Sequence, residues 1–262
     1  MRIISTLFAP LFHLFSLFYP LDKRRRTRYN ILTMENTLTL RPIAHIKTDF
    51  KEKFGIPRQS GRAPSLTAEL VFEPEFRNPD ALREIEGFSH LWLLFDFSLA
   101  HRDEWCATVR PPRLGGNARV GVFASRSPFR PNPIGLSCVR LLRVEKREKE
   151  GCVLILSGAD LLDGTPIFDV KPYLPFADCQ QDATGGYASA HERDGLTVHF
   201  PQALLEKIPM EKRAGLIECL ADDPRPSYQD EPERVYGMAF ADFQIKFKVE
   251  KDVLTVVDVL NA

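Results

Sequence analysis

The sequence predicts a mainly β protein, a β-barrel outside the Rossmann class with a small C-terminal α+β domain. Three observations support this prediction. Apolar segments of strand length outnumber helical segments through residue 175. No GxGxxG follows a predicted strand, so the usual dinucleotide-binding loop of a Rossmann fold is missing. After Asp178 the chain becomes small and polar before it turns helical, which indicates a separate domain.

The predicted barrel strands are short and separated by turn-forming residues. They are expected at residues 38–46, 66–72, 88–97, 119–124, 136–145, 152–156 and 166–170. The segment 88–97, FSHLWLLFDF, is rich in aromatic residues and leucine, which favours a buried central strand. A short helix is expected at residues 79–86, because Pro79 suits a first helical turn.

The C-terminal domain is expected to combine a broken helix with a small sheet. The helical pattern covers residues 201–220, and Pro209 interrupts it. Strands are expected at residues 235–240, 243–249 and 253–259. We therefore place the barrel domain at residues 34–180, a linker at 181–199 and the C-terminal domain at 200–262.

Residues 1–33 look foreign to the rest of the chain. An apolar run at residues 3–21 is followed directly by the cluster KRRRTR. A secretory signal carries its positive charge before the apolar run, so this order argues against one. A signal anchor is the alternative, although Pro10 and Pro20 weaken a membrane-spanning helix. We interpret these residues as translated upstream sequence, with Met34 as the natural start.

Composition excludes several classes of protein. The five cysteines form no CxxC pair, and the six histidines form neither HxxxH nor HExxH. We therefore expect no disulfide framework, no metal, no membrane partner and a reducing, cytoplasmic setting. The formal net charge is zero, but the basic N-terminal residues leave the remainder net acidic. Binding to nucleic acid would thus require a local basic patch.

Residues 110–137, RPPRLGGNARVGVFASRSPFRPNPIGLS, supply such a patch. The segment holds arginines, prolines and glycines but no acidic residue. Prolines make rigid corners, glycines let a ligand approach the backbone, and guanidinium groups bind carboxylates and phosphates. We interpret this segment as a cradle for an external anion, with Arg126 and Arg130 facing it. The alternative is a barrel corner whose arginines are merely solvated.

Two residues are candidates for catalysis. Asp160 follows a predicted strand and precedes the turn at Asp163 and Gly164. Asp163 is explained by that turn, so Asp160 is the better functional candidate of these two carboxylates. Asn132 lies between two prolines, which suits a precisely aimed amide, although Pro-Asn-Pro also makes a plain turn. Lys171 could form an ordinary ion pair with Asp169, worth little to stability.

Other side chains are weaker candidates. His90 stands at the start of an aromatic strand, where a hydrogen-bonded core histidine is commoner than a catalyst. Arg58 and Gln59 follow a proline in a predicted loop and could touch a ligand. In DPRPSY, Arg225 and Tyr228 could hold a phosphate and stack a base, or could form a solvated turn.

Several long segments resemble the TsaA-like, or TrmO, family of tRNA (N6-threonylcarbamoyladenosine-37-N6)-methyltransferases. They are KEKFGIPRQ, GFSHLW, TVRPPRLGGNARVGVFASRSPFRPNPIGLS, DLLDGTPIFDVKPYLPFAD and DPRPSY. The resemblance runs from about residue 38 to residue 248, and residues 1–33 have no counterpart in it. It implies a TsaA-like barrel that binds S-adenosylmethionine as a homodimer. The implied substrate is the modified adenosine beside the anticodon of threonine tRNA that reads ACY codons.

The resemblance also implies which residues bind the cofactor and the RNA. The expected cofactor-binding residues are Ser60, Gly61, Arg62, Ser98, Leu99, Arg126, Leu136, Ser157, Gly158, Ala159 and Asp160. At Ser98 and Leu99 the residue types differ from the family, so those contacts would come from the backbone. The expected contacts to the tRNA anticodon stem-loop are Arg58, Arg130, Lys171, Arg225 and Tyr228.

Methyl transfer to a carbamoylated nitrogen requires in-line approach and loss of the N–H proton. We expect Asp160 to act as the base and to steady the sulfonium charge, with Asn132 as a second catalytic group. Arg126 is expected to serve the cofactor and Arg130 the RNA. Two alternatives remain open: a non-catalytic RNA-binding module, and an S-adenosylmethionine enzyme with another substrate.

Overall fold

The computed structural model describes residues 38–111, 114, 118–191, 195–225 and 231–261. The chain divides into two compact units, Met1–Thr39 and Leu40–Ala262, and every element described below belongs to the second. The expected N-terminal extension, residues 1–33, and Tyr228 lie outside the described residues. Within the described part of the chain, no helix is long and apolar enough to cross a lipid bilayer.

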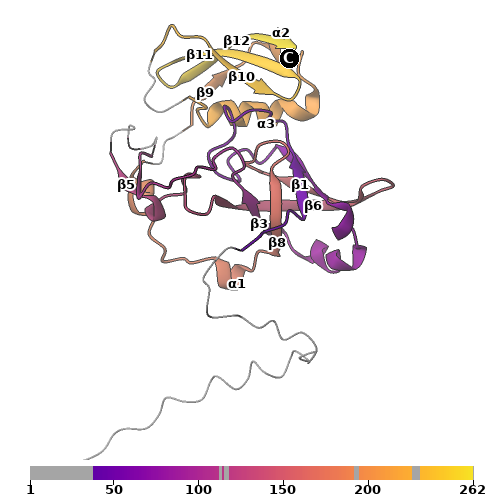
Figure 1. Ribbon diagram of the computed structural model, residues 1–262. Helices are drawn as coiled ribbons and strands as arrows, with labels where there is room; N and C mark the ends of the chain where they lie inside the picture. Colours follow the sequence, from indigo (N-terminus) through magenta and orange to yellow (C-terminus); the bar gives the residue numbers. More distant parts are fainter. Residues whose placement is uncertain (1–37, 112–113, 115–117, 192–194, 226–230, 262) are drawn as a thin grey trace, which may run out of the picture. The chain divides into compact units, whose positions relative to one another are not determined.

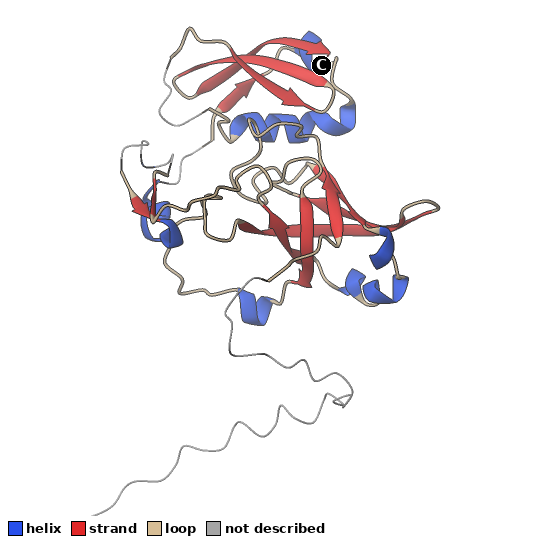
Figure 2. Cartoon of the chain, in the orientation of Figure 1, coloured by secondary structure: helices blue, strands red, loops and turns tan. Residues whose placement is uncertain are grey.

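Six strands close into a ring with the topology of a barrel (Figures 1 and 2). They are β1 (Ala44–Lys47), β2 (Thr67–Phe72), β7 (Gly151–Ser157), β6 (Ile134–Arg147), β3 (His90–Asp96) and β8 (Pro166–Pro172), in that order around the ring. Every neighbouring pair is antiparallel. The prediction of a mainly β fold outside the Rossmann class is therefore confirmed, because a Rossmann sheet is mostly parallel.

Alternation along β6 decides which side chains face the inside of the ring. Gly135, Ser137 and Val139 are buried, whereas Ile134 and Leu136 are exposed. The buried positions join a core that includes Ala44, Ile46, Leu70, Leu91, Leu93, Phe95, Leu154, Leu156 and Ile167. Ser137 is thus a polar side chain beside an apolar core, and such a group requires a hydrogen-bond partner.

Three expected elements differ in the structure. Two 3-10 turns, η2 (Pro79–Leu82) and η3 (Ile85–Gly87), replace the helix expected at residues 79–86. Glu84 lies between them with φ 67°, a left-handed conformation that interrupts a helix. The first strand begins only at β1, after Pro42, which cannot donate a ladder hydrogen bond.

The strand expected at residues 119–124 is also shorter than predicted. It is confined to β5 (Val120–Gly121), which pairs with β4 (Thr108–Val109), and η5 (Val122–Ala124) follows. Further short elements are η1 (Pro74–Phe76), α1 (Pro175–Asp178) and η6 (Gly186–His191). The last of these lies within the expected linker.

The C-terminal elements form a second, four-stranded sheet with two helices. The strand order is β10 (Tyr236–Phe240), β11 (Phe243–Glu250), β12 (Val253–Asn261) and β9 (Thr197–His199). The helices are α2 (Gln202–Leu205) and α3 (Met210–Ala221), and Pro209 separates them as the sequence predicts. The three-residue β9 was not expected, because it pairs in parallel with β12 and carries too short a pattern to recognise.

A second hydrophobic core joins this sheet to the loop that follows β1. Phe50, Ala63 and Leu66 from that loop are buried with α3 and β10–β12 residues, which include Leu216, Leu220, Met238, Phe240, Ile245 and Phe247. The fit is close at Gly215 of α3, where an added Cβ would lie 2.5 Å from Cδ2 of Leu66. The loop between β1 and β2 is therefore held by the C-terminal elements as well as by the ring.

Candidate functional site

Asp160 lies just after β7, beside the buried serine of β6. The Ser137 hydroxyl donates a hydrogen bond of 2.6 Å to Oδ1 of Asp160. Burial raises the pKa of the Asp160 carboxyl above its ordinary value. The hydrogen bonds from Ser137 and from the backbone of Asp160 and Ser60, together with the charge of Arg126, oppose that rise in pKa. A half-buried carboxylate with a raised pKa is a stronger base than a solvated one.

The loop with Ser60 and Gly61 is seated directly on the end of β7. The Gly61 backbone N–H donates to the carbonyl of Gly158 at 2.9 Å, and the Ser157 hydroxyl donates to the carbonyl of Pro64 at 2.5 Å. Gly158 has φ +73°, and an added Cβ there would lie 3.1 Å from both Cα and N of Gly61. Two glycine backbones thus approach more closely than side chains would allow.

Arg126 reaches this loop from the arginine-rich segment. Its Nη1 donates to Oε1 of Gln59, whose own Nε2 donates to the Arg58 carbonyl at 2.5 Å. The partner of Arg126 is therefore a neutral amide, and in the described part of the chain Arg126 forms no ion pair with a carboxylate. Its side chain is exposed. The guanidinium is consequently positioned but keeps its charge available for an anion.

The C-terminal elements brace the same loop. Asp222, at the end of α3, accepts hydrogen bonds from Nε of Arg62 at 2.8 Å and from the Arg58 backbone N–H at 3.3 Å. Glu218, one turn earlier, accepts from the backbone N–H of Ser65 at 2.8 Å and from its hydroxyl at 2.7 Å. The Asp222 side chain is largely buried. The position of the loop therefore depends on both parts of the fold.

The structure brings together only some of the residues expected to bind the cofactor. Hydrogen bonds or charge connect Ser60, Gly61, Arg126, Ser157, Gly158 and Asp160 to one another or to the same loop. Ala159, which lies between Gly158 and Asp160 in the sequence, is buried. Arg62 is hydrogen-bonded to Asp222. We refer to these residues, together with Gln59 and Ser137, as the Asp160 cluster.

Four other expected site residues have no hydrogen bond to that cluster in the described structure. Ser98 and Leu99 form an exposed turn after β3, where the Leu99 carbonyl accepts from Nζ of Lys53 at 3.1 Å. Leu136 is 55% exposed on the outer side of β6, opposite in direction to its neighbour Ser137. Asn132 is exposed in the turn that leads into β6.

Two arginines expected to contact tRNA are instead used by the fold. Arg225 is buried, and its guanidinium pairs with the Asp223 carboxylate at 2.9 and 3.1 Å. Nη2 of Arg58 donates to the carbonyls of Asp223 and Arg225 at 3.1 and 2.7 Å. These contacts hold the two guanidiniums against acceptors of the protein itself. Contact of Arg58 and Arg225 with tRNA phosphates stays a prediction.

Arg130 and Lys171 are also engaged within the chain. Nη1 of Arg130 donates to the carbonyl of Ser125 at 2.7 Å and, more weakly, to those of Val122 and Ser127. Arg130 thus braces the turn that follows β5. Lys171 is exposed on β8 and pairs with Asp169 at 2.7 Å, the ordinary ion pair that the sequence allowed. His90 accepts or donates a hydrogen bond with the Ser89 hydroxyl at 2.9 Å.

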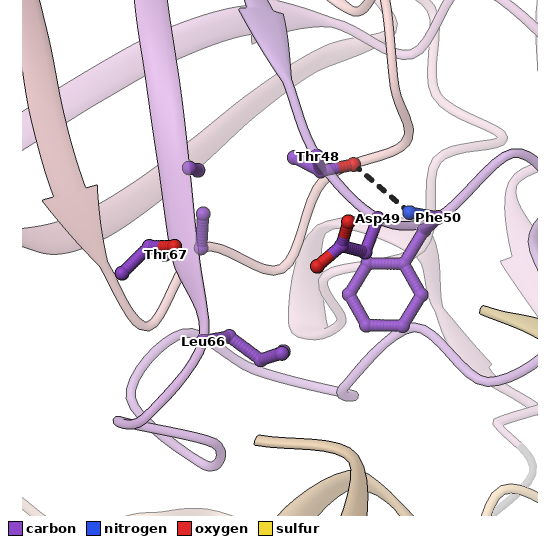
Figure 3. Close-up of a pocket in the computed structure, with 7 residues that line it drawn as sticks. Thr48, Asp49, Phe50, Leu66 and Thr67 are labelled. Atoms are coloured by element: carbon purple, nitrogen blue, oxygen red, sulfur yellow. Dashed lines mark hydrogen bonds between the residues drawn. The ribbon is translucent and has the colours of Figure 1, made fainter. Parts of the chain in front are cut away.

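A small hollow lies next to the cluster (Figure 3). It is lined by Thr48, Asp49, Phe50, Leu66, Thr67, Ala68 and Ala159. The carboxylate of Asp49 is already bound there by Nζ of Lys212, at 2.6 and 2.7 Å. Among the described residues, no group of side chains is suited to hold a metal ion.

Sequence reasoning missed Ser137 and Asp222 and gave Gln59 only a minor place. The alternation of β6 places Ser137 on the buried side of the strand, between Gly135 and Val139. A serine at such a position could have been recognised from the sequence as a candidate site residue. Asp222 carried no comparable signal, because its partners Arg58 and Arg62 are distant in the sequence.

Comparisons with known proteins give a consistent result. Residues 45–179 match the family model of the tRNA-methyltransferase O N-terminal domain, and residues 194–262 match that of the TrmO C-terminal domain. The chain is 45% identical over 216 residues to tRNA (adenine(37)-N6)-methyltransferase of Escherichia coli, covering 79% of this chain and 91% of the relative.

Two relatives from Pseudomonas aeruginosa extend this similarity. The chain is 45% identical over 232 residues to a protein named "Putative S-adenosylmethionine-dependent methyltransferase RcsF", covering 85% of this chain and 98% of the relative. A crystal structure of TrmO superimposes with a TM-score of 0.70 at 37% identity, covering 86% of this chain and 98% of that one.

Proposed function

Because this chain belongs to the TrmO family of tRNA methyltransferases, we propose that its Asp160 cluster carries the family's reaction. The protein is an S-adenosylmethionine-dependent methyltransferase that acts on N6 of adenosine 37 in tRNA. The observation that carries this conclusion is the 45% identity to the Escherichia coli enzyme over 91% of its length. The Asp160 cluster supplies side chains suited to that chemistry.

The cluster has the charges that S-adenosylmethionine requires. The carboxylate of Asp160 would face the positive sulfonium, and the guanidinium of Arg126 would bind the methionine carboxylate. The backbone around Gly61 is open, since an added Cβ there would meet no atom within 4 Å. When bound, the cofactor supplies an electrophilic methyl group, and the chain has to orient the nitrogen and remove its proton.

Asp160 is the group we assign to proton removal. Its raised pKa makes it a better proton acceptor, and the hydrogen bond from Ser137 fixes the orientation of the carboxylate. We also propose that the substrate nitrogen carries a threonylcarbamoyl group and that the tRNA is threonine tRNA reading ACY codons. A carbamoylated N–H is more acidic than that of plain adenosine, so a carboxylate is an adequate base. Asn132 stays a second candidate for orienting this group.

Methylation of defined tRNAs tests the proposed substrate. The purified protein is incubated with labelled S-adenosylmethionine and threonine tRNA that carries or lacks the threonylcarbamoyl group, and the digested nucleosides are analysed by mass. We expect methylation of the modified adenosine alone. Binding of tRNA without any methylation would favour a non-catalytic RNA-binding module, and methylation of plain adenosine would refute the proposed modified substrate.

We further propose that the active form is a homodimer in the cytoplasm. The resemblance implies that Leu136 binds the cofactor, yet its side chain points out of the ring and is 55% exposed. A second copy that covers this face would bring Leu136 and the exposed side of the Asp160 cluster into one site. Sedimentation at micromolar concentration is expected to give the mass of two chains, whereas the mass of one chain would contradict the proposal.

Replacing Arg126 by alanine is expected to raise the Kd for S-adenosylmethionine by roughly 10- to 100-fold, as loss of a charged hydrogen bond does. Gln59 would also lose its donor. Calorimetric titration measures the effect. Arg119 belongs to the same segment but donates to the Thr108 hydroxyl, so Arg119→Ala serves as the matched control and should bind the cofactor normally. Equal affinities of the two variants would remove Arg126 from the cofactor site.

A further inference from the structure

Two large aromatic side chains lie exposed beside the arginine-rich segment. The rings of Trp105 and Phe123 stack with centroids 6.2 Å apart and an interplanar angle of 29°. Trp105 is 54% exposed and Phe123 is 72% exposed. Exposed aromatic side chains that contact each other on a surface mark a binding site more often than isolated ones do. We call these two residues the aromatic platform.

The fold builds the platform from two segments that are distant in the sequence. β4 and β5 pair through Thr108 with Gly121 and Val109 with Val120, and the Val122 N–H donates to the Ala107 carbonyl at 2.9 Å. Trp105 precedes this pairing and Phe123 follows it, so the ladder brings the two rings together. The platform is therefore held by backbone hydrogen bonds, and Figure 1 shows β5 at the left of the ring.

One guanidinium lies beside the platform, and others belong to the neighbouring segments. The guanidinium of Arg130 lies 6.0 Å from the centroid of Phe123, and that of Arg102 lies 3.7 Å from the centroid of Phe129. In the described structure, Arg102, Arg119, Arg126 and Arg130 form no ion pair with a carboxylate. Asp103 and Glu104 are exposed just before Trp105 in the sequence.

We propose that the aromatic platform stacks an unpaired nucleobase of the tRNA anticodon loop, next to the adenosine that is methylated. The inference rests on the proposed function and specifies how the RNA is held. Single-stranded RNA combines the two features that this surface complements, flat bases and phosphate charge. Phe123 and Arg126 are three residues apart, so at most about 10 Å separates their Cα atoms. A short stretch of RNA backbone bridges that distance between the platform and the Asp160 cluster.

Tryptophan fluorescence tests the contact directly. The chain contains two tryptophans, and Trp92 is half-buried with its Nε1 bound to Asp178 at 3.0 Å. Trp92→Phe thus leaves Trp105 as the only tryptophan, which is excited selectively at a wavelength that tyrosine does not absorb. Titration with an unmodified anticodon stem-loop of threonine tRNA is expected to quench this emission to saturation. Emission that stays constant while the RNA binds would overturn the inference.

Substitutions separate stacking from charge. Trp105→Ala and Phe123→Ala are each expected to weaken stem-loop binding on the order of 10-fold, with unchanged affinity for S-adenosylmethionine. Phe176→Ala is the matched control, because Phe176 is 87% exposed on α1 and should have no effect. The platform variants should keep the wild-type slope of log K against log salt, whereas Arg119→Gln should reduce that slope by about one.

The failures of the inference and of the proposed function are distinguishable. Wild-type protein that neither binds nor methylates tRNA refutes the function. Wild-type protein that methylates tRNA, together with platform variants equal to Phe176→Ala, refutes the platform alone. A shift of Trp105 emission with protein concentration in the absence of RNA would instead assign the platform to a contact between two copies, and would also overturn the inference.

Discussion

Replacing Asp160 by asparagine is expected to slow methyl transfer by about 10²–10⁴-fold, the usual contribution of a general base. Asparagine has nearly the same shape and can still accept the hydrogen bond from the Ser137 hydroxyl. It cannot accept the substrate proton or offset the sulfonium charge. Single-turnover rates at saturating cofactor and tRNA measure the effect on the chemical step.

The same variant should be as stable as the wild type or more stable. The pKa of Asp160 is raised in the folded protein because burial disfavours its charged form. The contribution of Asp160 to the free energy of unfolding is therefore most favourable below the pKa that the group has in the unfolded chain. It is lost as pH rises through the pKa of the folded protein. At neutral pH the folded protein holds an unfavourable buried charge, and asparagine removes it. Thermal unfolding of the two proteins at pH 7 checks this.

Activity has the opposite dependence on pH. The base works only when it is deprotonated, so the rate of the wild type should fall as pH decreases through the raised pKa of Asp160. That acid limb should disappear in Asp160→Asn. Asp163→Asn is the matched control: Asp163 is exposed in the following turn, where it accepts from the Thr48 backbone N–H at 2.9 Å. If both variants lose activity equally, Asp160 is not the base.

Replacing Gly158 by alanine should disrupt the cofactor loop as well as strain the backbone. Gly158 has φ +73°, and an alanine Cβ would lie 3.1 Å from Cα and N of Gly61. The left-handed conformation costs alanine about 1–2 kcal/mol. The close contact also pushes Gly61 away, and its N–H then loses the 2.9 Å hydrogen bond to the Gly158 carbonyl. We expect both a lower Tm and a Kd for S-adenosylmethionine raised by roughly tenfold or more.

Gly164→Ala separates these two effects. Gly164 has φ +76°, nearly the same backbone strain, but no atom lies within 4 Å of an added Cβ. The Gly164 variant should therefore lose comparable stability and bind the cofactor normally. Calorimetry with S-adenosylmethionine, performed well below both unfolding temperatures, compares the two. A Gly158 variant that binds the cofactor as tightly as the Gly164 variant would show that the approach to Gly61 is not needed.

The sequence predicted Asp160 and Arg126 as site residues from their own segments, and the segment around Ser60 from the resemblance to the family. It could not show that Ser137 completes the group, because that requires β6 to place Ser137 inward beside the end of β7. The burial of Arg225 also follows from the tertiary structure. Its carboxylate partner, Asp223, is a neighbour in sequence, but no local pattern shows that the Arg225 side chain is buried.

The sequence by itself determined the strand-rich, non-Rossmann architecture, the break between α2 and α3 and the family, because these depend on local patterns and long motifs. Only the tertiary structure decided which arginines are available to ligands. Arg58 and Arg225 are used inside the protein, whereas among the described residues the guanidinium of Arg126 is hydrogen-bonded to the amide of Gln59. The availability of a charge depends on burial and on partners that can lie far along the chain, and a local sequence pattern shows neither.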